Sequence, residues 1–385
     1  MRKARLLLAA ACVSASVALS GVAAAVGSKT HPNGLPPDPA NFPIGVWLQS
    51  PRLAPEYQAI GVNLFVGLNK GPTEDELAEL ARHGMPAFAE QNDVGLGSPN
   101  ANMIRGWLLK EDEPDNAQAL PSGGWGQCVP AKAVVAETRA IKAKDPTRPV
   151  LVSFGRGAAD PSWMGRGNCT GDLAYYGKAA VGADILAFDI YPVSSGYGDE
   201  LDYPARGVMR LKAAAQDGQH VWVIIETTRG GWRNARVTPA ELRSEILLAV
   251  TAGVDGVIYF AHEWTGGFRE DGLFRYPEIV RAVKDMNALL MRLAPVINSP
   301  TIEGRVAASG TIPFMTMLKE QGGALYLFAG STDPKPGSAA FAVQGVADGR
   351  AEVVGEDRQV PISNGVLRDD FKGYEVHIYR MSGGG

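Results

Sequence analysis

WLLKEDEP at residues 107–114 and VWVIIE at residues 221–226 are the stretches that decide the fold. Each contains a short apolar run, rich in large and β-branched residues, that leads into a glutamate, Glu113 or Glu226. Runs of this kind are typical of strands buried in a parallel sheet. The two runs are the fourth and the seventh of eight similar runs. We therefore expect both glutamates at the same end of one sheet.

The eight runs alternate with helical segments. They are Pro43–Gln49, Val62–Leu68, Met85–Glu90, Ile104–Leu109, Val150–Phe154, Ile185–Tyr191, Val221–Glu226 and Val257–Trp264. This alternation predicts parallel strands joined by right-handed crossovers, and eight units over about 250 residues predict an α/β fold with a closed (β/α)8 barrel, a TIM barrel. An open doubly wound sheet is the less favoured alternative, because no glycine-rich phosphate turn follows the first run.

The sequence divides into four segments. Residues 1–26 begin with basic residues, continue as an alanine-rich apolar stretch and end near Ala23-Ala24-Ala25, which predicts a secretory signal peptide. Residues 27–42 form a proline-rich arm, 43–298 the barrel, and 299–385 a small antiparallel β-sandwich. The strands expected in this last domain are Arg305–Ala308, Phe314–Leu318, Ala324–Ala329, Ala339–Val343, Ala351–Gly355 and Tyr374–Tyr379.

The signal peptide predicts a secreted or periplasmic protein with no integral membrane segment after cleavage. A membrane anchor and lipid attachment at Cys12 are the alternatives for the same stretch. Cys128 and Cys169 are a candidate disulfide, because the compartment is oxidising and both fall in loops after neighbouring strands. Two buried free thiols are the other reading.

The composition argues against several kinds of partner. The net charge is −4 and no basic run follows the N-terminus, so nucleic acid is not expected to bind. The five histidines have no ligand-like spacing, so no metal and no other cofactor is expected. The oligomeric state stays open.

Two carboxyl groups at the mouth of a barrel predict cleavage of glycosidic bonds. One must protonate the leaving oxygen, and the other must attack the anomeric carbon or activate water. Glu113 is the predicted proton donor, because the negative charges of Glu111 and Asp112 oppose its ionisation. Glu226 is the predicted nucleophile. A short separation across a narrow mouth would make the reaction retaining.

Other side chains at the strand ends are expected to bind a carbohydrate substrate. They are Trp47, Gln91, Asp112, Asp189, Tyr191 and Trp264, with Trp125, Trp163 and Trp232 in loops as further sugar contacts. Asp189 and Tyr191 share one side of the sixth run, where the tyrosine hydroxyl can orient the nucleophile. Trp264 offers a flat apolar face to a sugar ring. Taken singly, each of these residues has plain packing as its alternative reading.

With these residues in place, the chain resembles clan A of the glycoside hydrolases over about Pro43 to Leu293, and the last domain resembles the β-sandwich that many of these enzymes carry. The resemblance implies that Glu113 is the acid/base and Glu226 the nucleophile. It also implies that Tyr191 contacts the nucleophile and that Trp264 lies under the sugar. Asp112 departs from the clan, which usually has asparagine at this position to bond the 2-hydroxyl of the sugar.

Two other functions remain as alternatives. One is a carbohydrate-binding barrel without catalysis, suggested by the tryptophan-rich loops and by Asp112. The other is a lyase or a Schiff-base aldolase, for which Lys110 is the candidate amine at a strand end.

Overall fold

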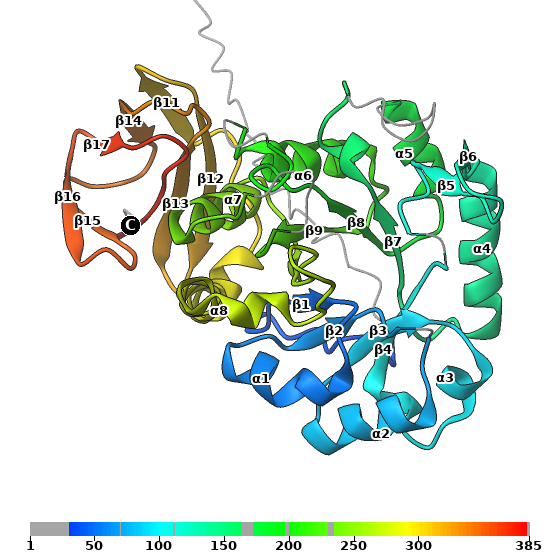
Figure 1. The fold of residues 1–385 in the computed structure, drawn as a ribbon. Coiled ribbons are helices and arrows are strands. Elements are labelled where there is room, and N and C mark those ends of the chain that lie inside the picture. Colours follow the sequence, from blue (N-terminus) through cyan, green and yellow to red (C-terminus); the bar gives the residue numbers. More distant parts are fainter. Residues whose placement is uncertain are drawn as a thin grey trace, which may run out of the picture.

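A closed barrel of eight parallel strands forms the larger part of the molecule (Figure 1). The computed structural model describes residues 31–69, 71–110, 112–162, 172–196, 200–229 and 235–382, so the predicted signal peptide and Cys12 lie outside the described residues. In barrel order the strands are β1 (Ile44–Trp47), β2 (Leu64–Val66), β3 (Ala87–Glu90), β4 (Ile104–Leu108), β7 (Val150–Phe154), β8 (Ile185–Asp189), β9 (His220–Glu226) and β10 (Gly256–Phe260).

Pairing of β1 with both β2 and β10 closes the barrel, since Gly45 is opposite Leu64 on one side and Ile258 on the other. The predicted barrel is therefore confirmed, and the open doubly wound sheet is excluded. Several predicted runs extend past the observed strands, because residues such as Tyr191 and Trp264 leave the hydrogen-bonded ladder and enter the loops at the mouth.

Helices surround the barrel, and capping residues mark the start of two of them. The helices are α1 (Ala54–Ala59), α2 (Glu74–His83), α3 (Asp93–Gly97), α4 (Ala131–Lys144), α5 (Leu173–Ala179), α6 (Tyr203–Ala214), α7 (Pro239–Thr251) and α8 (Pro277–Ile297), with 3-10 turns at Pro51–Leu53, Ala101–Met103, Arg156–Ala158 and Gly272–Arg275. Thr73 and Thr238 each form a capping box at the start of α2 and α7. Among the described residues, no helix is long and apolar enough to cross a membrane.

Side chains alternate between two apolar cores along each barrel strand. In β9, Trp222 and Ile224 lie in the barrel interior, and Val221, Val223 and Ile225 pack against the helices. The interior is filled by large side chains and is not a pore.

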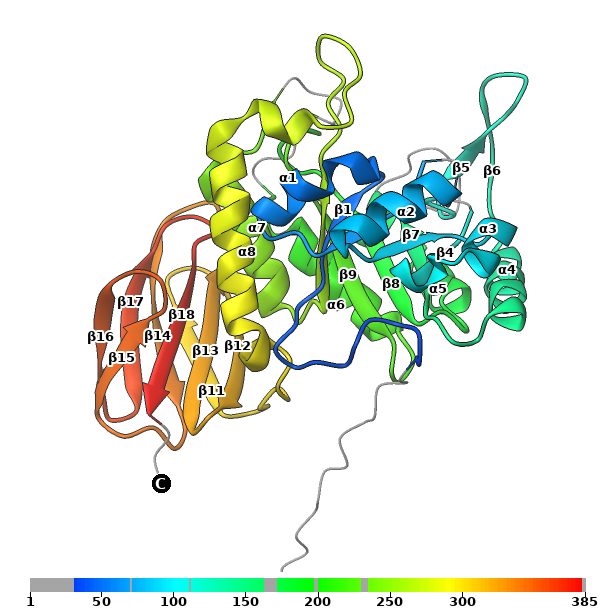
Figure 2. The same cartoon turned by 90° about the horizontal axis from the view of Figure 1, so that it is seen from below.

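A hairpin that the sequence pattern did not predict is inserted between β4 and α4. Its strands are β5 (Ala117–Ala119) and β6 (Trp125–Cys128), and it projects from the barrel in Figure 2. The strands are too short for their alternation to stand out. Cys128 is part of a disulfide; Cys169, its predicted partner, lies outside the described residues.

The C-terminal domain is an antiparallel sheet curled around its own apolar core. Its strands are β11 (Val306–Gly310), β12 (Phe314–Gln321), β13 (Ala324–Ser331), β14 (Gly337–Val343), β15 (Gly349–Val353), β16 (Arg358–Ser363), β17 (Val366–Phe371) and β18 (Val376–Ser382), in the order β11-β14-β17-β16-β15-β18-β13-β12. This agrees with the predicted β-sandwich. The predicted set of strands lacked β16 and β17, which carry several charged residues.

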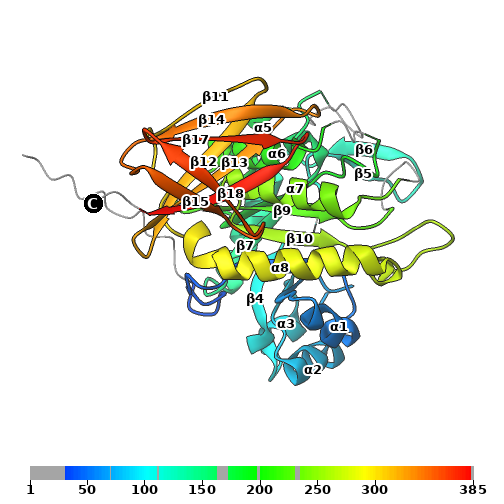
Figure 3. The ribbon, with the colours of Figure 1, turned by 90° about the vertical axis from the view of Figure 1, so that its left-hand side faces the viewer.

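Helices α7 and α8 lie between the barrel and this sheet, as Figure 2 shows for α8, and Figure 3 shows the sheet from its outer side with α8 running below it. Phe328 and Ile378 point from the sheet into the same core as the barrel helices. The contact is close, because a Cβ added at Gly330 of β13 would lie 2.7 Å from Leu248 of α7. The two domains therefore share one continuous apolar interface.

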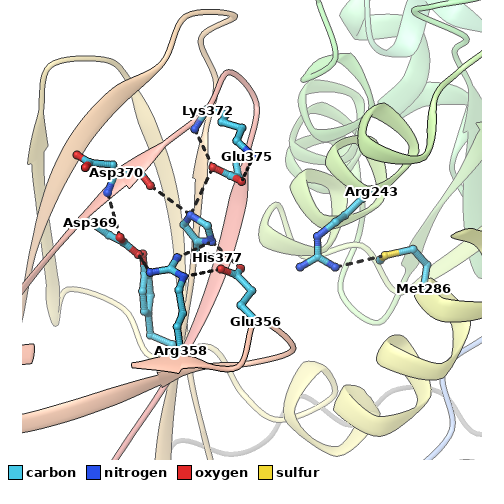
Figure 4. A network of polar contacts seen from close by, with 10 residues as sticks. Arg243, Met286, Glu356, Arg358, Asp369, Asp370, Lys372, Glu375 and His377 are labelled. Atoms are coloured by element: carbon cyan, nitrogen blue, oxygen red, sulfur yellow. Dashed lines mark hydrogen bonds and ion pairs between the residues drawn. The ribbon is translucent and has the colours of Figure 1, made fainter. Parts of the chain in front are cut away.

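A polar network lies on the sheet side of this interface (Figure 4). Buried His377 is 2.6 Å from Glu356, and Arg358 forms ion pairs of 2.8 Å with both Glu356 and Asp369. Burial opposes ionisation of Glu356, but the contacts with His377 and Arg358 outweigh it and lower the pKa of this carboxyl. Arg243 of α7 faces the network from the barrel side.

Substitution of Gly207 on α6 tests how closely this helix packs against the barrel. A Cβ at this position would lie 2.2 Å from the Phe188 ring of β8. Gly207→Ala should therefore lower the free energy of unfolding by about 1–3 kcal/mol, although alanine is the better helix former. Gly177→Ala in α5 is the matched control, because its nearest contact would be an ordinary 3.7 Å, and it should be neutral or stabilising. Urea unfolding measures both; equal stability of the two variants would contradict this packing.

Candidate active site

Acidic side chains gather at the barrel mouth, where the C-terminal ends of β4, β7 and β8 meet. Asp112 and Glu113 follow β4, and Asp189 ends β8. Glu113 and Asp112 are the charged groups with the largest influence on Asp189, so the three carboxyl groups lie close together. We call these three residues the acid cluster.

Glu113 is held in a constrained position between two strands. Its backbone has a φ of 48°, which is rare for a residue with a side chain, and its N–H donates to the Ser153 carbonyl of β7 at 3.2 Å. The Asn116 amide donates to the Glu113 carboxylate at 2.5 Å. A Cβ at Gly155 would lie 2.8 Å from that amide nitrogen and 3.2 Å from the carboxylate oxygen. Glycine at this position therefore leaves the room that Glu113 occupies.

Asp115 fastens the loop that carries Glu113. It is fully buried, and it accepts hydrogen bonds from the Gly155 N–H at 2.8 Å and from the Tyr176 hydroxyl at 2.9 Å. Burial outweighs these bonds and raises the pKa of Asp115 to about 6. This residue links the β4 loop to β7 and α5, which explains how a loop residue becomes fixed.

Two members of the acid cluster, Asp112 and Asp189, hold protons more tightly than isolated carboxyl groups do. Crowding by protein, followed by the charge of Glu113, raises the pKa of Asp112 to about 7, although solvent reaches its side chain. Burial, followed by the charges of Glu113 and Asp112, raises the pKa of Asp189 well above its usual range. The negative charge of each neighbour therefore opposes ionisation of Asp112 and Asp189.

An aromatic wall leads from the acid cluster to the rim of the barrel. Tyr191, beside Asp189, lies 4.9 Å from the ring of Phe260, which stacks on Trp264 at 5.7 Å with an interplanar angle of 16°. Phe268 lies 5.7 Å from Trp264. Trp264 is 49% exposed and Phe268 62% exposed, so the outer end of the wall is open to solvent.

Trp47 and Gln91, two of the residues predicted to bind the substrate, make other contacts in the structure. Trp47 is 7% exposed and packs in the barrel interior, where it lines a small pocket of about 70 Å³ together with Lys110 and Asp112. The Gln91 amide donates to the Ile141 carbonyl of α4 at 3.1 Å. This bond uses Gln91 to hold a helix, and the geometry does not support its predicted contact with a sugar.

Glu226 ends β9, as the strand count predicted, but it is 1% exposed and does not join the acid cluster. Its two oxygens accept the N–H groups of Val193 and Ser194 at 2.7 and 2.8 Å. Burial raises its pKa to about 7, and Glu245 of α7 lies beside it. The geometry therefore gives no support to the prediction that Glu226 is the nucleophile.

Lys110, the candidate amine for Schiff-base chemistry, is exposed, and its backbone N–H donates to Glu137 at 2.7 Å. Trp125 of the hairpin is 55% exposed; Trp163 and Trp232 lie outside the described residues. Across the part of the chain that the structure describes, no group of three or more His, Cys, Asp or Glu side chains is arranged to hold a metal ion.

A cavity of about 660 Å³ lies at the opposite end of the barrel, between the N-terminal arm and the C-terminal sheet. Two of its acidic groups are paired: Asp184 with Lys142 at 2.7 Å, and Asp255 with Lys212 at 2.9 Å. Each of these two aspartates also accepts an N–H at the start of a neighbouring strand, Val150 of β7 for Asp184 and Val221 of β9 for Asp255. These contacts stabilise the barrel, and the mouth remains the candidate site.

Sequence reasoning missed the residues that hold the acid cluster in place. Asp115 and Asn116 follow Glu113 directly in the sequence, and Gly155 follows the fifth barrel strand. Phe260 and Phe268 complete the aromatic wall. Proximity to a predicted catalytic residue was the only signal in the sequence for the first two.

No family model and no curated protein matches this sequence. Solved structures do match in fold. An α-amylase from Geobacillus thermoleovorans, in complex with acarbose, is 11% identical with a TM-score of 0.54, covering 92% of this chain and 99% of the other. A putative α-galactosidase from Bacteroides fragilis is 10% identical with a TM-score of 0.54, covering 90% and 80%. A family 39 glycoside hydrolase from Bacteroides cellulosilyticus is 11% identical with a TM-score of 0.50, covering 90% and 82%. At these identities the likeness establishes the fold.

The raised pKa of Asp112 predicts a dependence of stability on pH. Because its pKa is about 7 when folded, against an ordinary 3.8, the folded chain binds the extra proton. Ionising Asp112 therefore lowers the free energy of unfolding as pH rises from about 4 to 7. Asp112→Asn removes this loss, so the variant should gain about 1 kcal/mol relative to wild type at about pH 8 compared with about pH 4, after allowance for solvent screening.

Chemical unfolding at the two pH values measures this gain. Asp285→Asn, on an exposed part of α8, removes the same charge elsewhere and should show no such change. A difference between Asp112→Asn and wild type that does not vary with pH would refute the shift.

Proposed function

We propose that the protein is a glycoside hydrolase that cleaves O-glycosidic bonds of a poly- or oligosaccharide. The observation that carries this proposal is the acid cluster at the barrel mouth, next to an exposed aromatic wall. Such hydrolysis needs one carboxylic acid and one carboxylate, and it needs an apolar face for the sugar ring. The similar solved structures are those of an α-amylase, a putative α-galactosidase and a family 39 glycoside hydrolase, which adds support. The predicted signal peptide makes the proposed enzyme secreted or periplasmic.

Glu113 and Asp189 are the proposed catalytic pair. Hydrolysis with retention requires that one carboxyl group is the acid and the other the carboxylate. Glu113 reaches the mouth from a loop beyond β4 and is assigned proton donation to the leaving oxygen. Asp189 ends β8 on the side that faces the barrel interior and is assigned attack on the anomeric carbon. The Tyr191 hydroxyl beside Asp189 orients it.

This assignment keeps the predicted acid/base and the retaining double displacement, but it replaces Glu226 by Asp189 as nucleophile. A nucleophile must present an oxygen to the substrate. Glu226 is buried and uses both oxygens to accept backbone N–H groups, whereas Asp189 belongs to the acid cluster.

Removing either proposed catalytic carboxyl group should nearly abolish turnover. Glu113→Gln and Asp189→Asn are expected to lower kcat at least about 100-fold, because each loses a group that acts only in the transition state. The measurement is sugar release from a panel of plant, bacterial and algal polysaccharides. NMR of the first product should show that the anomeric configuration is retained.

Azide distinguishes the two candidate nucleophiles. It should restore turnover to Asp189→Ala and not to Glu226→Ala, since azide replaces only a missing nucleophile. The opposite result would return that role to Glu226. Binding of glycans in calorimetry without any product from the wild type would favour the alternative function, a carbohydrate-binding barrel.

Trp264 should contribute to binding of the sugar. Trp264→Ala is expected to raise KM about tenfold with little change in kcat, because stacking on the ring acts equally on the ground state and the transition state. Met209→Ala, on an exposed position of α6, is the control and should leave KM unchanged. An unchanged KM in Trp264→Ala would remove the aromatic wall from the proposed site.

A further inference from the structure

Two glutamates meet behind the seventh barrel strand. Glu226, at the end of β9, is 1% exposed, and Glu245, on α7, is fully buried. Neither takes part in an ion pair recorded between described residues. Two carboxyl groups in contact within an apolar core cannot both be ionised at low cost, because their like charges repel in a medium of low dielectric.

The hydrogen bonds around this pair place the shared proton. Glu226 accepts the N–H groups of Val193 and Ser194, so it needs negative charge. Glu245 lies within hydrogen-bonding reach of Glu226, and neither of its oxygens has a well-aligned partner in the described parts of the chain. A protonated Glu245 can donate to Glu226, whereas an ionised Glu245 would be a buried acceptor without a donor.

The two N–H groups belong to the loop that carries half of the candidate active site. Val193 and Ser194 come directly after the segment Asp189 to Pro192. The loop then turns back on itself, since the Ser195 N–H donates to the Tyr191 carbonyl at 3.0 Å. The hydrogen bonds from Val193 and Ser194 to Glu226 therefore fix the position of Tyr191 relative to the barrel.

We infer that Glu226 and Glu245 share one proton and act as a positioning pair that holds the loop after β8, and with it Asp189 and Tyr191, in place. The effect of the pair on turnover rests on the proposed hydrolase function. The hydrogen bonds that hold the loop to Glu226 do not rest on that proposal, because they are a property of the folded chain alone.

The attachment of this loop to the pair Glu226 and Glu245 should weaken at alkaline pH. Loss of the shared proton puts two negative charges side by side, and the Glu241 carboxylate on α7 adds a third. Among the described residues, the N–H groups of Val193 and Ser194 and the Ser194 side chain, on the β8 side, favour charge on Glu226, and so does a hydrogen bond from Glu245. Burial raises the pKa of Glu226 to about 7 and that of Glu245 well above its usual range, so the change falls on the alkaline side of neutrality.

Hydrogen exchange of residues 190–196 in the full chain tests, without a substrate, how firmly Glu226 holds the loop. After correction for the intrinsic pH dependence of exchange, protection of Val193 and Ser194 in the wild type should fall about tenfold above neutral pH. Glu245→Gln should keep that protection, because its amide still donates and cannot ionise. Glu226→Gln should lose about tenfold at every pH, since its amide cannot accept both N–H groups. Glu241→Gln, which keeps the α7 capping box, is the control and should match the wild type.

Turnover provides the second measurement. The alkaline limb of the kcat profile should move to higher pH in Glu245→Gln and stay in place in Glu241→Gln. Protection in the wild type that does not depend on pH, or equal protection in Glu226→Gln and wild type, would overturn the inference. Azide rescue of Glu226→Ala would also overturn it, because Glu226 would then touch the substrate. If exchange behaves as expected and no polysaccharide is cleaved, the positioning pair stands and the proposed hydrolase function fails. If Glu226→Gln does not fold, the comparison of Glu245→Gln with the wild type tests the inference by itself.

Discussion

Closure of the barrel between β1 and β10 is the constraint on which the other features depend. A closed parallel sheet has no edge, so each strand finds partners on both sides and its C-terminal end opens onto one common mouth. Closure brings residues after β4 and at the ends of β8 and β10 together, although they are far apart in the sequence. At the opposite end, Asp184 and Asp255 accept N–H groups of Val150 and Val221, near the start of the neighbouring strands β7 and β9.

Like charges are concentrated at two places in this barrel, and they differ in access to solvent. The acid cluster opens to the mouth, where solvent reaches the Asp112 side chain. The pair Glu226 and Glu245 is closed, and backbone N–H groups satisfy the charged member. Both places cost stability, because burial disfavours like charges that lie close together. The apolar cores on either side of the barrel wall offset that cost.

The C-terminal sheet extends the larger of these cores. One face of β13 and β18 packs on α7 and α8, and the other face encloses the core of the sheet itself. Helix α7 therefore has fixed neighbours on two sides, β9 and the sheet. Glu245 lies on that helix, so the position of the buried acid pair depends on both domains.

The sequence by itself determined the barrel, the ends of the capped helices and the location of Glu113, Asp189 and Trp264 at the mouth. These features follow from local patterns: apolar runs of strand length, capping residues, and a polar or aromatic residue where a strand ends. Direction and contact were decided only by the tertiary structure. Alternation along β9 puts Glu226 on the inner side with Trp222 and Ile224, but N–H groups from the β8 loop and a carboxyl group from α7 draw it into the wall. Such partners come from distant parts of the chain, and no local pattern encodes them.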